Sequence, residues 1–246
     1  MTAPAILADT RRPAKQHRAV LREIIIVGLG YLVYSQVRGL AADRVKDAFE
    51  NGYWIVALER EIGIWREIAF QALILPHDAL VQFFNFIYFY GLFPLLLPTA
   101  AWLFVKRPDL YLLARNAFLI SGAIAVCFYL LVPTAPPRLI GLGVVDTLGG
   151  LTIAHESIPG ANPYAALPSM HVGWNFLTAV ALYLALPRFP GRFLVLLLPL
   201  AMFTATVATG NHYILDGALG IAVALTGLGL ALWFQRWYGQ RQARLS

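Results

Sequence analysis

Two histidines, each placed where a polar segment gives way to an apolar run, are the residues of this sequence best suited to chemistry. His171 follows the Gly- and Pro-rich segment 133–169, and His212 opens a later apolar run with Asp216 four residues after it. Side chains four residues apart share one face of a helix, so the Asp216 carboxylate can hold one nitrogen of His212 and leave the other as a base or nucleophile. A structural His–Asp cap at a helix start is the alternative, and the second histidine at a matching junction argues against it.

The same junctions carry groups that bind anions. A helix N-terminus offers backbone N–H groups and the positive end of the helix dipole, which suit a phosphate. Arg138 is the only Lys or Arg between Arg115 and Arg188, and the guanidinium fork matches phosphate oxygens. The stiff sequence PTAPP before Arg138 favours a fixed placement over an arginine that snorkels at the interface. We expect Ser169, Asn211 and the backbone of residues 209–211 to add donors to the same anion.

Three aromatic residues near these junctions, Tyr164, Trp174 and Tyr213, are candidates for contacts with an acceptor or a lipid. Their rings can limit the access of water and hold an acceptor by stacking on its ring face. An ordinary belt of aromatic residues at the membrane interface explains each of them equally well when it is taken alone.

A metal ion fits this set of residues less well than a phosphate does. His171, His212 and Asp216 can hold one ion, but a phosphate–metal site usually gathers more carboxylates. Asp146 and Glu156 lie in the intervening loop, at a spacing that does not require a shared ion. The single cysteine of the chain excludes a disulfide framework and a cysteine-based metal site. We therefore expect neither a metal nor a cofactor.

The composition is that of a membrane protein. Of the 246 residues, 59% are hydrophobic and 13% charged, whereas soluble domains are roughly 45–50% apolar. Six apolar runs each approach the roughly 20 residues that a helix needs to span a bilayer. We predict an all-α, polytopic membrane protein with six transmembrane helices in one bundle. The predicted spans cover residues 23–40, 80–105, 116–132, 171–186, 193–208 and 213–234.

The segments outside these spans complete the expected domain organisation. Residues 43–65 mix charges with apolar residues at near-helical spacing, which predicts an amphipathic helix at the membrane interface. Residues 1–20 and 237–246 are basic, and we expect them to be cytoplasmic tails on either side of a six-helix catalytic domain at 21–236. The first segment lacks the apolar core of a cleavable signal peptide. Nothing in the chain suggests a nucleic-acid partner.

The distribution of basic residues predicts the orientation. Six spans place both termini on one side, and cytoplasmic segments are enriched in Lys and Arg. With the termini inside, 13 of the 19 Lys and Arg residues fall in inner segments and 6 in outer ones. The loop 133–169, with Arg138 and His155, and the junction at His212 then lie outside. We expect a multi-pass protein of the cell membrane whose active site is extracytoplasmic.

The motifs PSMH at residues 168–171 and HxxxD at residues 212–216, after an arginine in a polar loop, resemble those of the type 2 phosphatidic acid phosphatase (PAP2) superfamily. The longer strings PTAPPR, LPSMH and TGNHYILD are most similar to its inositol-phosphotransferase branch, which includes the fungal inositol phosphorylceramide synthases and many bacterial relatives. Three motifs in the right order and a matching six-span layout extend the resemblance over most of the chain.

The resemblance implies a mechanism and a set of roles. His212 is implied to be the nucleophile that forms a phosphohistidine, with Asp216 orienting it. His171 is implied to be the general acid for the leaving group. Arg138 and Ser169 are implied to bind the phosphate of a lipid substrate. The group would then pass to an alcohol or polyol acceptor, or to water.

The sequence departs from the phosphatase pattern at two positions. Leu131 stands where that pattern has a Lys seven residues before the first-motif Arg, and Ala205-Thr206 replaces the Ser-Arg before the third motif. Loss of two cations favours a phosphodiester substrate and a lipid phosphotransferase, since a phosphate monoester carries more charge. A lipid or polyprenyl phosphate phosphatase is the second hypothesis. A lipid transporter without catalysis is the third, and it would not need the two histidines.

Overall fold

The computed structural model describes residues 11–40, 42–149 and 162–245, and the regular elements within these ranges are helices joined by loops. A lone bridge joins Thr134 to Ala165, without strands on either side. The all-α prediction is therefore confirmed for this part of the chain. His155, Glu156 and the first ten residues of the expected N-terminal tail lie outside the described residues. The helices are α1 (Arg11–Gly39), α2 (Val45–Glu61), α3 (Glu67–Ile74), α4 (Asp78–Tyr90), α5 (Phe93–Lys106), α6 (Pro108–Leu131), η1 (Pro137–Leu139), α8 (Met170–Ala185), η2 (Pro190–Leu196), α9 (Leu197–Ala208) and α10 (Ile214–Leu245).

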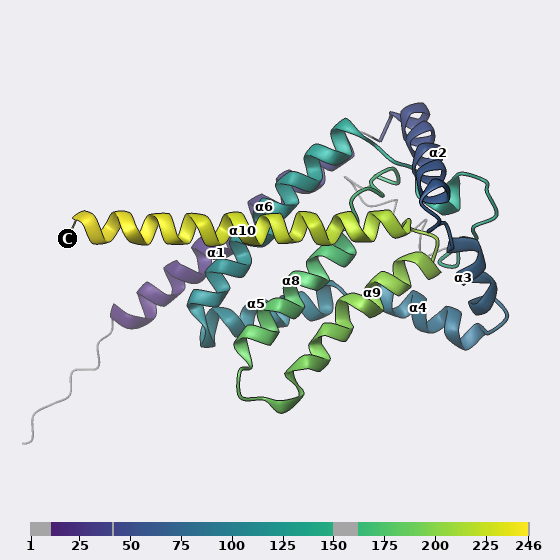
Figure 1. The fold of residues 1–246 in the computed structure, drawn as a ribbon. Helices are drawn as coiled ribbons and strands as arrows, with labels where there is room; N and C mark the ends of the chain where they lie inside the picture. Colours follow the sequence, from purple (N-terminus) through teal and green to yellow (C-terminus); the bar gives the residue numbers. More distant parts are fainter. Residues whose placement is uncertain (1–10, 41, 150–161, 246) are drawn as a thin grey trace, which may run out of the picture.

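The long helix α10 crosses the bundle, and its C-terminal part projects beyond the other helices (Figure 1). It packs against α6 and α8, while α9 lies beside α8 and α1 runs along α6 (Figure 1). Small buried residues, among them Ala117, Ala224 and Ala231, let these helices approach closely. Large apolar side chains cover the outer surface of the bundle, as on α9, where Leu197 and Leu200 are more than half exposed. An apolar exterior of this kind suits a lipid environment.

Four helices are long and apolar enough to cross a membrane: Arg18–Gly39 of α1, Pro108–Leu131, Pro190–Ala208 and Ile214–Arg241. A fifth arises if α4 and α5, which are bent by 41° at a short break, count as one span. We had expected a continuous span over 80–105, and the chain instead breaks where Gly91 and Pro94 interrupt the helical pattern. Helix α8 has 16 residues, which is about 24 Å of helix and shorter than a full span.

Both terminal helices extend into the segments that we had expected to be tails. Helix α1 begins at Arg11 and α10 runs to Leu245. The residues concerned are mostly Arg, Gln, Ala and Leu, which favour helix, and the only proline, Pro13, lies in the first turn of α1, where it is tolerated.

Helices α2 and α3 cover the end of the bundle where α10 begins, away from the C-terminus (Figure 1). The buried residues of α2 lie on one face, at Ala48, Gly52, Ile55, Val56 and Glu59. Helix α2 lies inside the predicted amphipathic segment 43–65, whereas α3 was not anticipated. Because Gly52 has no side chain, α2 can approach the Tyr213 hydroxyl at the start of α10: a Cβ there would lie 2.9 Å from it.

A glycine pair brings the two histidine-bearing helices into backbone contact. A Cβ on Gly173 of α8 would lie 2.5 Å from the carbonyl oxygen of Gly220 on α10. A Cβ on Gly220 would overlap the carbonyl oxygen of Ser169. The Ser169 amide also donates a hydrogen bond of 2.9 Å to the carbonyl of Asp216. These contacts fix the start of α8 against the first turns of α10. They therefore determine the position of His171 relative to His212.

Candidate active site

The imidazole of His212 is held through its Nδ1 atom. This nitrogen lies 2.8 Å from the carbonyl oxygen of Ala166 and 3.3 Å from Oδ2 of Asp216. Both neighbours can accept a hydrogen bond, so in the neutral imidazole the proton belongs on Nδ1 and the lone pair on Nε2. Asp216 is fully buried in the first turn of α10, and its Oδ2 also accepts the Tyr213 amide at 3.0 Å. The expected His–Asp contact is present, and the Ala166 carbonyl is a second acceptor that the motif did not reveal.

His171 lies close to His212 although the two come from different helices. It occupies the first turn of α8, and the two ring centroids are 6.1 Å apart. Tyr88 of α4 stacks on the His171 ring at 4.6 Å with an interplanar angle of 21°. This partner was not predicted, because Tyr88 is one of several aromatic residues in the segment 83–90. The stacking restricts the orientation of the His171 ring.

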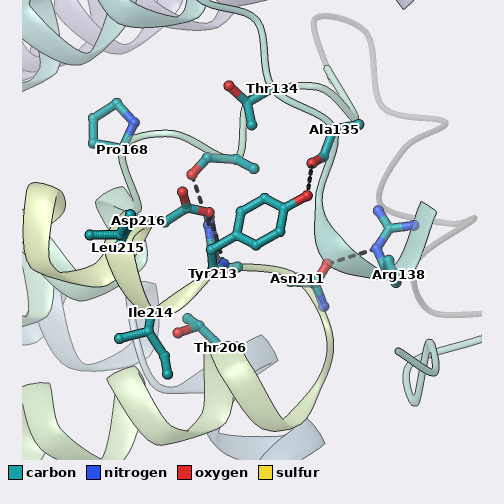
Figure 2. Close-up of polar contacts among 12 residues, drawn as sticks. Thr134, Ala135, Arg138, Pro168, Thr206, Asn211, Tyr213, Ile214, Leu215 and Asp216 are labelled. Carbon is teal, nitrogen blue, oxygen red and sulfur yellow. Dashed lines mark hydrogen bonds and ion pairs between the residues drawn. The ribbon is translucent and has the colours of Figure 1, made fainter. Parts of the chain in front are cut away.

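Arg138 joins the same cluster through Asn211. Its Nε donates a 3.0 Å hydrogen bond to Asn211 Oδ1 (Figure 2), and its backbone amide donates to the carbonyl of Gly210. A terminal nitrogen lies 3.7 Å from Oδ2 of Asp146. The turn η1 that carries Arg138 thus packs directly on the loop before α10. Gly210 has a φ of 71°, which favours glycine there.

These groups line one cavity of about 300 Å³. His171, His212, Arg138 and Asn211 all contribute to its wall. Much of the remaining wall is aromatic and consists of Tyr31, Tyr34, Tyr88, Phe89, Phe93 and Tyr129. A cavity with two imidazoles, a guanidinium and aromatic walls suits a phosphate group attached to an apolar molecule.

Other predicted site residues are not among those that line this cavity. The Ser169 hydroxyl is buried, with no hydrogen-bond partner among the described residues. Tyr164 packs near Phe49. Trp174 donates to Ser121, and the buried Tyr213 donates its hydroxyl to the carbonyl of Ala135 (Figure 2). The three aromatic rings thus pack against neighbouring segments outside this cavity, and their expected contacts with an acceptor or a lipid stay a prediction.

The backbone amides around the second motif are also engaged within the protein. Those of Thr209, Gly210 and Asn211 donate to carbonyls of α9. We had expected this backbone to offer donors to an anion, but the end of α9 uses them in its own C-terminal turn.

Three carboxyl groups cap the first amides of α10. Glu67 accepts from Ile214 at 3.1 Å and Glu59 accepts from Leu215 at 2.7 Å, beside the Asp216–Tyr213 bond. Both glutamates are fully buried. Burial, with the neighbouring Glu67 carboxyl, raises the pKa of Glu59 to about 9, so Glu59 is protonated at neutral pH. The N-terminus of α10 is thereby closed to an external anion, and the first turn of α8 is the helix start nearer the cavity.

Among the described residues, no group of three or more His, Cys, Asp or Glu side chains could hold a metal ion. Asp146, which we had considered as a metal ligand, lies beside Arg138.

A second, larger cavity of about 810 Å³ lies between α1, α5, α6 and α8. Its lining is mostly apolar, and it includes Trp174. Tyr31, Tyr34 and Phe93 line both cavities. The apolar cavity and the histidine cavity therefore share a wall of aromatic side chains.

The fold and the site together define a class of helical membrane proteins. In this class two histidines, one of them paired with an aspartate, lie beside an arginine in one cavity. The family model of the PAP2 superfamily matches residues 53–230, and the chain belongs to this superfamily. It is 30% identical over 142 residues to phosphoinositol dihydroceramide synthase of Bacteroides thetaiotaomicron, a match that covers 50% of this chain and 46% of that protein. The matched segment thus spans about half of the relative's length. No solved structure matches the chain significantly.

Proposed function

We propose that this protein is a lipid phosphotransferase. It cleaves a phosphoester of a membrane lipid through a phosphohistidine on His212 and passes the phosphorus-containing group to an alcohol. The observation that carries this proposal is the arrangement at His212, where Ala166 and Asp216 hold Nδ1 and leave Nε2 as the nucleophile. Membership of the PAP2 superfamily supports phosphoester chemistry at this site.

The proposed reaction has two halves. In the first, Nε2 of His212 attacks the phosphorus, the bond to the leaving oxygen breaks, and His171 gives that oxygen a proton. In the second, His171 takes the proton of the acceptor hydroxyl, whose oxygen attacks the phosphorus and breaks the bond to Nε2. Asp216 stabilises the positive charge that His212 gains, and Arg138 stabilises the charge on the phosphate oxygens.

A phosphodiester is the proposed donor. Leu131 is largely exposed and Thr206 donates its hydroxyl to the carbonyl of Phe203, so neither position supplies the cation of the phosphatase pattern. The name of the Bacteroides relative suggests the first pair to test, a phosphoinositol lipid as donor and dihydroceramide as acceptor.

The experiment uses the purified full chain in detergent. It is offered phosphatidylinositol with dihydroceramide, a phospholipid diester with free inositol and, separately, phosphatidic acid. We expect a transfer product from a diester, little free phosphate from phosphatidic acid, and no loss of activity with EDTA. His212→Ala should lose both turnover and the acid-labile phosphoenzyme. Rapid phosphate release from phosphatidic acid that no alcohol affects would identify a lipid phosphatase instead.

We further propose that the chain crosses the membrane six times, with α4 and α5 as one bent span and α8 as a short one. Both termini would then lie in the cytoplasm, and the cavity with the histidines would face the outside of the cell membrane. The excess of Lys and Arg in the proposed inner segments supports this orientation.

A further inference from the structure

A second arginine lines the cavity of the two histidines. Arg38 belongs to the last turn of α1 and shares the cavity wall with His171, His212 and Arg138. It lies 100 residues before Arg138 in the chain and in no motif of the family pattern. Only the packing of α1 along α6 brings it to the site.

A reciprocal pair of hydrogen bonds holds Arg38 in place. Its terminal nitrogen donates to the backbone carbonyl of Asn162 at 3.2 Å, and the Asn162 side-chain amide donates to the backbone carbonyl of Arg38 at 2.8 Å. Asn162 is almost fully buried, and its Oδ1 also accepts the Tyr164 amide. Two segments far apart in sequence are thus joined at this arginine, which limits the positions that its guanidinium can take.

The positive charge of Arg38 has no counter-charge in the described part of the chain. Its Nε is buried without a hydrogen-bond acceptor, and no described carboxylate forms an ion pair with the side chain. Arg138 differs, because Asp146 lies beside it. A buried cationic donor without an acceptor is unfavourable and marks a place where a ligand can supply what the protein lacks.

We propose that Arg38 is a phosphate ligand of this site, acting with Arg138 on the phosphate of the lipid donor. This inference rests on the proposed function. It explains how the site tolerates Leu131 and Thr206, because α1 supplies a cation that the motif positions do not. Two guanidinium groups also match the charge that builds up on a phosphodiester as a nucleophile adds to it.

The test uses the full chain in detergent with inorganic phosphate as the probe, and it follows the rise in melting temperature as phosphate is added. We expect Arg38→Gln to raise the apparent Kd for phosphate about tenfold or more, and Arg38→Lys to recover part of the affinity. Arg22→Gln is the matched control, since it removes an exposed arginine that lies 16 residues before Arg38 on the same helix. It should leave the Kd unchanged.

The outcomes separate this inference from the proposed function. If Arg138→Gln weakens phosphate binding and Arg38→Gln does not, Arg38 is not a ligand and the proposed function stands. If phosphate does not stabilise the wild-type protein, both proposals fail. Asn162→Ala provides a second measurement should Arg38→Gln not fold, because it releases the guanidinium and should also weaken binding. Wild-type phosphate affinity in both Asn162→Ala and Arg38→Lys would overturn the inference.

Discussion

At the scale of single residues, the chemistry depends on which nitrogen of His212 carries a proton. Two acceptors, the Ala166 carbonyl and the Asp216 carboxylate, share the Nδ1 proton. The carbonyl can preserve the tautomer by itself, so the specific contribution of Asp216 is its negative charge beside an imidazole that becomes positive during the reaction.

Because the Ala166 carbonyl can hold the tautomer and Asp216 supplies the charge, the effect of Asp216→Asn can be predicted. The side chain stays nearly isosteric and can still accept a hydrogen bond, so the protein should fold and bind phosphate as the wild type does. Turnover should fall by at least about 100-fold, because the charge that stabilises the imidazolium is gone. Phosphoenzyme formation after rapid mixing measures this step, and a rate close to that of the wild type would remove Asp216 from the mechanism.

The buried Glu59 predicts how stability depends on pH. Its folded-state pKa of about 9 lies above its ordinary value of 4.5. Between these values the unfolded chain has lost the proton that the folded chain keeps, so stability falls as pH rises. The slope for one such group is at most about 1.4 kcal/mol per pH unit. Below the lower value both states are protonated and the loss disappears.

Glu59→Gln tests this prediction because glutamine cannot ionise but can still accept the Leu215 amide. Its melting temperature should change less than that of the wild type between about pH 6 and about pH 8.5. Glu59→Ala is the contrasting variant, since it leaves that amide without an acceptor and opens a cavity; it should cost about 2 kcal/mol or more. Equal pH slopes for Glu59→Gln and the wild type would contradict a protonated Glu59.

The sequence was sufficient to find site residues whose placement depends on near neighbours in the chain. His212 and Asp216 are one helical turn apart, and the loop before His171 marks its helix start, so their positions follow from local rules. Glu59, Tyr88 and Arg38 could not be found in this way. Each looks like an ordinary residue of an amphipathic or apolar helix, and its place at the site comes from contacts across the fold.

At the scale of elements, the contact between α8 and α10 positions the two imidazoles. Gly220→Ala should separate the two helices, because its Cβ would overlap the Ser169 carbonyl oxygen. We expect turnover to fall by about 100-fold, since a displacement of about 1 Å has this effect when catalytic groups must align. Gly229→Ala on the same helix has open space around it and is the matched control. Activity and melting temperature are measured for both variants. Equal activities for Gly220→Ala and Gly229→Ala would refute the prediction.

The elements were predictable where apolar runs are long and unbroken. The runs that became α6, α9 and α10 were visible in the sequence, whereas the break between α4 and α5 was missed. Gly91 and Pro94 mark that break, but their apolar neighbours kept the hydropathy of the segment high. Helix α3 was missed because it has only eight residues. Its Glu67 and Gln71 are buried by contacts with other segments, which polar residue types do not indicate in the sequence.

At the scale of the whole molecule, the proposed orientation predicts which loops are accessible from outside the cell. In a Cys127→Ala background, Val145→Cys should react with an impermeant thiol reagent in intact cells, because its side chain is exposed in the loop next to Arg138. Arg188→Cys, exposed in the turn between α8 and η2, should react only after the membrane is opened. The reverse pattern would place the histidine cavity in the cytoplasm.

The wall of Tyr31, Tyr34 and Phe93 that the two cavities share has a consequence for kinetics. A lipid whose chains occupy the larger cavity could present its phosphate to the histidines without leaving the bilayer. The rate would then depend on the surface concentration of the donor lipid in the membrane, not on its concentration in the bulk solution. Turnover in mixed micelles should follow the mole fraction of the donor lipid, and it should fall when inert detergent is added even though the bulk concentration of lipid stays the same.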